Sequence, residues 1–127
     1  VLKLCNAGHN PPILISPDEK ITFLKFNPQL FVGINDQYIY TDEEIILKKG
    51  SKLFLYTDGV TEAENTSKEL YGEERLSEVL SANTSSDVRA TVNTVVQSIS
   101  NHVQDAETSD DLTILLIHYE PENPTIK

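Results

Sequence analysis

Short apolar runs separated by turn residues dominate the first half of the chain and predict a meander of antiparallel strands. The runs cover residues 1–7, 13–16, 21–26 and 38–47, the last of them long enough for one or two strands. Residues 53–56 are apolar throughout, which is typical of a strand with both faces buried. This strand runs into Asp58 and Gly59, so a carboxylate lies where a core strand leaves the sheet.

The second half of the chain changes to the periodicity of helices. Residues 73–81 carry one apolar face, and residues 88–103 repeat apolar side chains at helical spacing. The members of this second stripe are Val88, Val92, Val95, Val96, Ile99 and Val103. Residues 85–87, Ser-Ser-Asp, offer N-caps for the second helix. A final apolar strand is predicted over residues 112–119, so the chain is expected to fold as an α+β domain.

Composition narrows the classes of function. With 127 residues the chain is long enough for one domain with a core of its own. Its net charge of −10, from 10 Lys and Arg against 20 Asp and Glu, argues against nucleic-acid partners and anionic membranes. No apolar stretch of the sequence reaches the length of a membrane span. The single cysteine, Cys5, excludes an internal disulfide framework and fits a reducing, cytoplasmic compartment.

Acidic residues flank both of the strongly apolar strands. Asp58 ends the first, and Asp110 and Asp111 precede the second. If the two strands are antiparallel neighbours, about 5 Å apart, these carboxylates converge at one edge of the sheet. Oxygen-only ligands favour hard cations such as Mg²⁺ or Mn²⁺. The alternative is that Asp58-Gly59 is an ordinary turn and that the later pair simply caps a loop.

Four stretches carry a resemblance to a known family. They are CNAGHNPPILI at 5–15, LFLYTDGVTEAEN at 53–65, YGEERL at 71–76 and SDDLTILLIHY at 109–119. In this order and at this spacing they resemble the signature blocks of the metal-dependent, type 2C-like serine/threonine protein phosphatases. The resemblance is to the bacterial branch typified by stage II sporulation protein E and the phosphatases that regulate stress sigma factors.

This resemblance implies a fold, an activity and a set of site residues. The fold is an antiparallel β-sandwich with flanking helices, in four layers α-β-β-α. The activity is hydrolysis of phosphoserine or phosphothreonine on a partner protein, by a water that a binuclear Mn²⁺ or Mg²⁺ centre activates. Asp58 and Asp110 match metal-ligand positions, while Asp111 and Gly59 match positions that support the ligands. By analogy, the substrate is an anti-sigma-factor antagonist.

The chain departs from the family pattern at its start. The family's earlier Asp-Gly block, which bridges the two metal ions, does not occur before the first strand. We therefore expect residues 1–120 to be the C-terminal part of a single phosphatase domain, with residues 121–127 as a tail. Such a chain should bind metal weakly, turn over poorly and self-associate through exposed sheet surface. The alternative is a non-catalytic phosphatase-like domain that binds a regulatory partner or senses a signal.

His9 is the one candidate for catalysis by a side chain, as a general acid on a glycine-containing loop. The alternative is structural. Gly8 permits the turn, Pro11 and Pro12 stiffen its exit, and Asn6 or His9 hydrogen-bonds the loop backbone.

Overall fold

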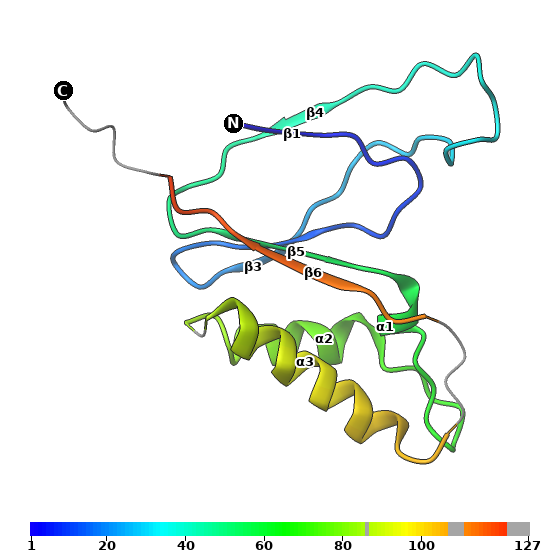
Figure 1. The fold of residues 1–127 in the computed structure, drawn as a ribbon, viewed down its shortest axis with the longest axis vertical. Helices are drawn as coiled ribbons and strands as arrows, with labels where there is room; N and C mark the ends of the chain where they lie inside the picture. The colour runs from blue at the N-terminus through cyan, green and yellow to red at the C-terminus, as the bar shows by residue number, and fades with distance from the viewer. Residues whose placement is uncertain (86, 107–110, 122–127) are drawn as a thin grey trace.

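Three layers make up the fold (Figure 1). The computed structural model describes residues 1–85, 87–106 and 111–121. A two-stranded sheet forms one outer layer, a four-stranded sheet lies in the middle, and the helices form the other outer layer. In chain order the elements are β1 (Leu2–Leu4), β2 (Ile13–Ile15), β3 (Ile21–Phe23), β4 (Glu43–Ile45), β5 (Lys52–Tyr56), α1 (Asp58–Thr61), α2 (Gly72–Ser81), α3 (Val88–Val103) and β6 (Ile114–His118).

The middle sheet has the strand order β3-β2-β5-β6, and every neighbouring pair is antiparallel. β5 and β6 pair along their whole length, from Lys52 opposite His118 to Tyr56 opposite Ile114. The antiparallel pairing on which a shared carboxylate site depends is therefore present. The chain that leaves β5 at Asp58 lies beside the chain that enters β6 (Figure 1).

The second sheet is smaller than the sequence predicts. β1 and β4 pair antiparallel with Leu2 opposite Ile45, and residues 5–7 and 38–42 lie outside both strands. The Gln29 side chain takes the place of a partner strand near β4. Its amide nitrogen donates to the Thr41 carbonyl and its amide oxygen accepts from the Thr41 nitrogen, both at 2.8 Å. The Thr41 N–H and C=O groups are thus both hydrogen-bonded without a neighbouring strand.

The main core lies between the middle sheet and the helices. Val95 and Ile99 of α3 reach it, with 0% and 4% of their surface exposed, as the predicted stripe requires. Val96 does not, and is 43% exposed, because consecutive helix positions point about 100° apart and only one valine of the pair can face the sheet. Thr91 is buried instead, and its hydroxyl is satisfied by donating to the Asp87 carbonyl at 2.9 Å.

The two longer helices begin close to their predicted positions. The Asp87 side chain caps α3 by accepting a hydrogen bond from the Ala90 nitrogen at 2.8 Å, while Ser86 lies outside the described residues. α1 is a helix of four residues that the hydrophobic pattern of the sequence does not predict. Its sequence, Asp-Gly-Val-Thr, has turn composition and is too short to show a helical period.

The predicted α+β sandwich is confirmed. Among the described residues, helices cover one face of the middle sheet, so three of the four expected layers are present (Figure 1). No helix in the described part of the chain is long and apolar enough to cross a membrane.

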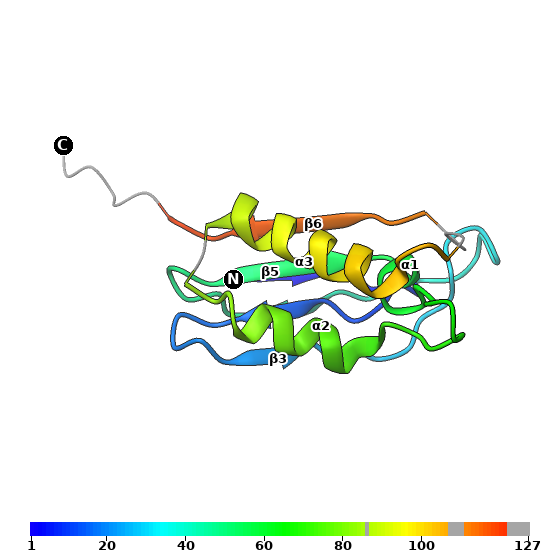
Figure 2. The same ribbon diagram turned by 90° about the horizontal axis from the view of Figure 1, so that it is seen from below.

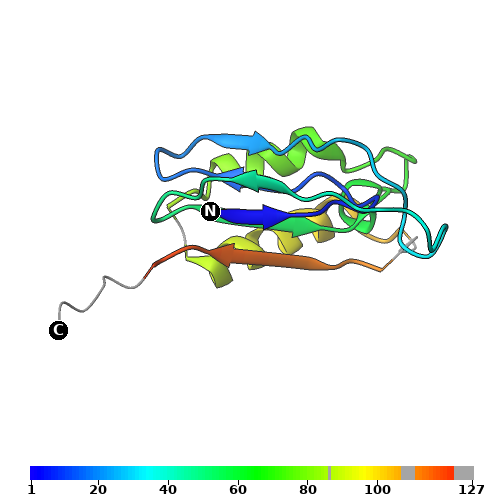
Figure 3. The ribbon, with the colours of Figure 1, turned by 90° about the horizontal axis from the view of Figure 1, so that it is seen from above.

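The two ends of the sandwich carry different features (Figures 2 and 3). α1 and the tip of the long loop between β3 and β4 lie at one end. The turn between β2 and β3 and the end of β6 lie at the other. Asp58, as the first residue of α1, therefore belongs to the end that carries the long loop.

Candidate functional site

Thr57 ties the end of β5 to the residues that lead into β6. Its backbone nitrogen donates to the Thr113 carbonyl at 3.1 Å. Its hydroxyl donates to the Asp111 carbonyl and accepts from the Thr113 nitrogen, each at 3.1 Å. One side chain thus both gives and receives a hydrogen bond across the two strands. Sequence reasoning misses Thr57, although its place between a buried strand and the Asp-Gly pair marks it.

Gly59 packs directly on the peptide group of Asp111. A Cβ atom added to Gly59 would overlap the Asp111 carbonyl oxygen and would lie 3.0 Å from its carbonyl carbon. These neighbours are backbone atoms of a residue whose carbonyl also accepts a hydrogen bond from the Thr57 hydroxyl, so they have little room to move aside. Close approach, rather than a positive φ, is therefore what requires glycine at position 59.

Asp58 is exposed on a backbone that is held on both sides. Thr57 precedes it with the bonds described above, and Val60, fully buried, follows it. The Asp58 carbonyl also accepts a hydrogen bond from the Glu62 nitrogen at 2.7 Å. The arrangement fixes the backbone at this position while its carboxylate faces solvent.

The structure brings together part of the predicted site. Asp58, Gly59 and the backbone of Asp111 meet at the end of β5 and the approach to β6. Asp110 lies outside the described residues, and within the ranges that are described no group of three His, Cys, Asp or Glu side chains could hold a metal ion. Asp58 places an exposed carboxylate at this junction, and carboxylate oxygens suit a hard divalent cation.

Tyr56 lies two residues before Asp58 and is 2% exposed. Its hydroxyl has no hydrogen-bond partner among the described residues. Burial, and to a lesser extent the negative charge of Glu73, raises the pKa of Tyr56 to about 12. The phenol therefore remains protonated at neutral pH and offers no base to the site.

His9 is held by its own loop. Its backbone nitrogen donates to Asn6 Oδ1 at 2.7 Å, and Asn6 Nδ2 donates back to the His9 carbonyl at 2.9 Å. The ring Nδ1 lies 3.1 Å from the carbonyl oxygen of Asn10. These contacts support the structural interpretation, and catalysis by His9 stays a prediction.

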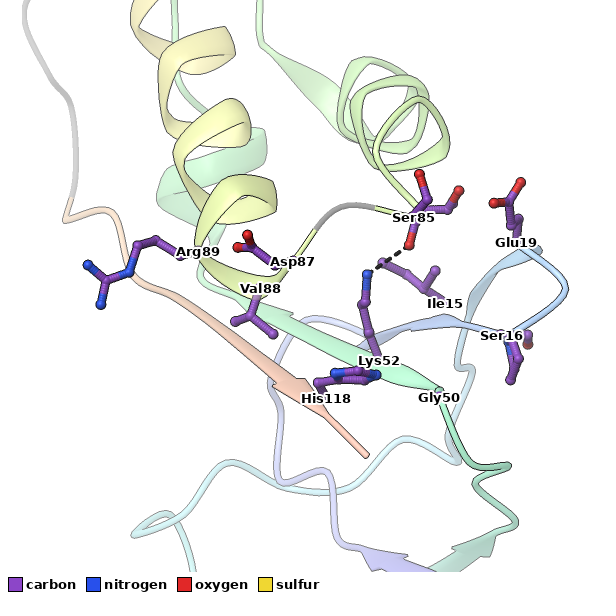
Figure 4. A pocket seen from close by; sticks show the side chains of 12 residues that line it. Ile15, Ser16, Glu19, Gly50, Lys52, Ser85, Asp87, Val88, Arg89 and His118 are labelled. Atoms are coloured by element: carbon purple, nitrogen blue, oxygen red, sulfur yellow. Dashed lines mark hydrogen bonds between the residues drawn. The ribbon is translucent and has the colours of Figure 1, made fainter. Parts of the chain in front are cut away.

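A cavity of about 720 Å³ lies beside Lys52 and His118, at the opposite end of the β5–β6 pair from Asp58. Figure 4 shows the side chains that line it. The Lys52 ammonium donates to the Thr84 carbonyl there at 2.7 Å. Acidic and basic side chains are nearly balanced around the cavity, with Glu19 and Asp87 against Lys52, Arg89 and His118. Its position and mixed charge separate it from the carboxylate end, so cavity size does not locate the candidate site.

Solved structures with a similar fold include phosphatase domains of the PP2C class. The SiaA-PP2C domain of Pseudomonas aeruginosa matches with a TM-score of 0.76 and 22% identity, over 93% of this chain and 47% of that chain. The Mn-presoaked phosphatase domain of SpoIIE from Bacillus subtilis matches with a TM-score of 0.66 and 13% identity, over 97% and 58%. The chain therefore has a PP2C-like α+β fold.

Sequence comparison identifies the family. Residues 1–120 match the profile of stage II sporulation protein E, and the chain belongs to this family. It is 30% identical over 117 residues to Protein IcfG of Synechocystis sp.. The aligned residues make up 92% of this chain and 18% of IcfG. The chain thus spans less than half of the SiaA domain and about a fifth of IcfG. The resemblance carried by the four sequence blocks is confirmed.

Proposed function

We propose that the full-length protein hydrolyses phosphoserine or phosphothreonine on a partner protein, with Mn²⁺ or Mg²⁺ as cofactor. The observation that carries the proposal is the junction of Thr57, Gly59 and Asp111, which joins the end of β5, where Asp58 lies, to the chain that leads into β6. Membership of a phosphatase family supports the same chemistry.

Each residue has a distinct part in this proposal. Asp58 and Asp110 would hold the cations, since each follows or precedes a strand of one antiparallel pair. Gly59 and Asp111 would keep the two blocks together, and Thr57 would fix the backbone in front of Asp58. The chemistry such cations supply when bound is activation of water and neutralisation of phosphoryl charge. The exposure of Asp58 leaves its carboxylate open to solvent and to an incoming phosphoryl group.

The proposal extends to the domain and its substrate. Residues 1–120 would form part of a single phosphatase domain whose complete form carries a binuclear centre. The substrate, by analogy with the family, would be an anti-sigma-factor antagonist in the cytoplasm. A net charge of −10 makes nucleic acid an unsuitable partner.

The test is a phosphopeptide assay on the full-length protein with Mn²⁺ and with a chelator. We expect turnover only with the metal. Asp58→Asn should lower it by about 100-fold or more, because even residues that merely support a metal ligand cost up to this factor. Asp18→Asn is the matched control, since Asp18 is an exposed aspartate of the β2–β3 turn at the other end of the sandwich.

Three results would overturn the proposal or a part of it. Turnover without metal would contradict the mechanism. Near-normal activity of Asp58→Asn would remove Asp58 from the ligands. Absence of any hydrolysis by the full-length protein would favour a non-catalytic domain that binds a partner.

A further inference from the structure

The loop of residues 27–41 between β3 and β4 turns apolar side chains toward solvent. They are Leu30, Phe31, Val32, Ile34 and Ile39, and their exposed fractions run from 37% to 85%. Apolar side chains gathered on one exposed loop are more typical of an interaction surface than of a surface that only meets water. We call this set the apolar loop.

Hydrogen bonds hold the backbone of the apolar loop, although its apolar side chains are exposed to solvent. Gln29 bonds both backbone groups of Thr41, and Tyr40 donates its hydroxyl to the Phe31 carbonyl at 3.1 Å. Asn27 donates through its backbone and its side chain to Glu43 Oε1, at 2.8 and 3.2 Å. Such bracing lowers the conformational entropy that a partner would have to remove on binding.

A pocket of about 540 Å³ opens between this loop and the loop that carries His9. Its apolar lining comes from Pro11, Phe26, Pro28 and Phe31, and Lys25 adds a positive charge. The Phe31 ring occupies the space that a side chain at Gly8 would fill, so glycine at position 8, with φ of +84°, is what lets the two loops meet.

The pocket lies at the same end of the sandwich as Asp58. Ile13 of β2 is opposite Phe54 of β5 and Phe23 of β3, so the residues before β2 and after β3 lie at the end where β5 leads into Asp58. Lys25 places a cation at the end of the sandwich where Asp58 and Glu62 are exposed. That charge favours a phosphorylated ligand.

We infer that this pocket binds an apolar side chain flanking the phosphorylated residue of a protein substrate. The inference rests on the proposed function and adds a specificity site to it. The volume suits one or two side chains of a peptide. The apolar walls would take the side chain, and Lys25 would attract the negative charge of the phosphopeptide.

The test uses two synthetic phosphoserine peptides that are identical except that the residues flanking phosphoserine are leucine in one and serine in the other. The full-length protein should show the higher kcat/KM for the leucine peptide. Phe31→Ala should lower the ratio of the two kcat/KM values about tenfold, as expected for loss of an apolar pocket contact. Ile46→Ala, which removes an apolar side chain that is 79% exposed outside the pocket, should leave the ratio unchanged.

A second variant keeps the inference testable if Phe31→Ala does not fold. Lys25→Glu should lower kcat/KM for both peptides several-fold, whereas Lys48→Glu, an equal charge change at another exposed lysine, should not. A purely structural role of Phe31 would lower both kcat/KM values and leave their ratio unchanged. An unchanged ratio, or a wild-type protein without preference, overturns the inference.

Failure of the proposed function can be recognised separately. Such failure means that the wild-type protein hydrolyses neither the peptides nor p-nitrophenyl phosphate with Mn²⁺. In that case, fluorescence anisotropy with labelled forms of the two peptides measures how tightly each binds to the pocket. Tighter binding of the leucine peptide that Phe31→Ala abolishes supports the pocket, and equal binding of both peptides overturns it. A Phe31→Ala variant that turns a dimer into a monomer without changing the ratio assigns the apolar loop to a second copy instead.

Discussion

Gly59 rests on the carbonyl group of Asp111, with no room between them for a side chain. The residues after β5 and those before β6 are therefore joined by backbone packing, by the backbone bond from Thr57 to Thr113 and by the Thr57 hydroxyl. Such a junction fixes the position of the two chain segments independently of whether the carboxylates are charged. It can hold the backbone at Asp58 in place before a cation arrives, which lowers the entropic cost of binding one.

Gly59→Ala should destabilise the domain and weaken Mn²⁺ binding. The added Cβ would force the Asp111 peptide away, and overpacking of this kind costs about 1 to 3 kcal/mol. Urea unfolding and calorimetric titration of the full-length protein measure the two effects. Gly50→Ala is the control, because Gly50 has φ of +85° but only ordinary contacts to Pro17. It should lose about 1 kcal/mol from backbone strain and keep its Mn²⁺ affinity.

Thr57→Val should lower the free energy of unfolding by about 1 to 3 kcal/mol, because the Asp111 carbonyl and the Thr113 nitrogen lose the hydroxyl that serves both. Urea unfolding measures the change. Thr94→Val provides the comparison, since the Thr94 hydroxyl makes only a local bond to the Ala90 carbonyl on the exposed side of α3. Equal losses in the two variants would refute a special role for Thr57.

Tyr56→Phe should leave stability at pH 7 unchanged or raise it slightly. The Tyr56 hydroxyl is buried without a partner among the described residues, and its removal relieves a desolvation cost. Thermal unfolding at neutral pH measures the effect. A clear loss of stability would mean that the hydroxyl has a partner, such as a buried water shared with Glu73.

The pH dependence of the same variant provides a separate prediction. Burial raises the pKa of Tyr56 to about 12 in the folded state, against 10 when exposed. Below pH 10 both states hold the proton and the stability is intact, whereas between pH 10 and 12 only the unfolded state releases it, so stability falls. Tyr56→Phe should reduce this alkaline loss. Some loss should persist, because burial also raises the pKa of Tyr71. Urea unfolding at pH 9 and pH 11 compares the two proteins.

Asp87→Ala should cost about 1 kcal/mol through loss of the N-cap of α3. Asp105→Ala, which removes an exposed aspartate just beyond the other end of the helix, should not destabilise the protein, since a negative charge there opposes the helix dipole. Chemical unfolding of both variants checks the assignment. Equal stability of Asp87→Ala and the wild-type protein would contradict it.

The elements with strong periodicity are those that the sequence predicts well. The apolar run at 53–56 becomes β5, and the stripe beginning at Val88 becomes α3 with its cap at Asp87. The sequence pattern of these elements is clear because β5 buries both of its faces and α3 buries one. The strand predicted from residue 38 begins only at Glu43, because Gln29 and Tyr40 hold the preceding loop through hydrogen bonds that no local sequence pattern reveals.

The candidate site is predictable only in outline. Alternation and charge place Asp58 and the approach to β6 at one sheet edge, and the β5–β6 register brings them together. The contact between Gly59 and Asp111 involves a main-chain carbonyl, which every residue type possesses and no sequence pattern can reveal. The metal-ligand roles of Asp58 and Asp110 stay predictions.

The bond from Thr57 to Asp111 joins residues 54 positions apart in the chain. Closing a loop of that length costs chain entropy before any contact compensates for it, and contacts of such range slow folding. α2 and α3 lie inside the loop, and their backbone hydrogen bonds join residues only four positions apart. The contacts of Thr57 with Asp111 and Thr113 require β5 and β6 to be paired. In a refolding experiment, we therefore expect Mn²⁺ to bind later than the helices form, so that metal binding marks the completed pairing of the two strands.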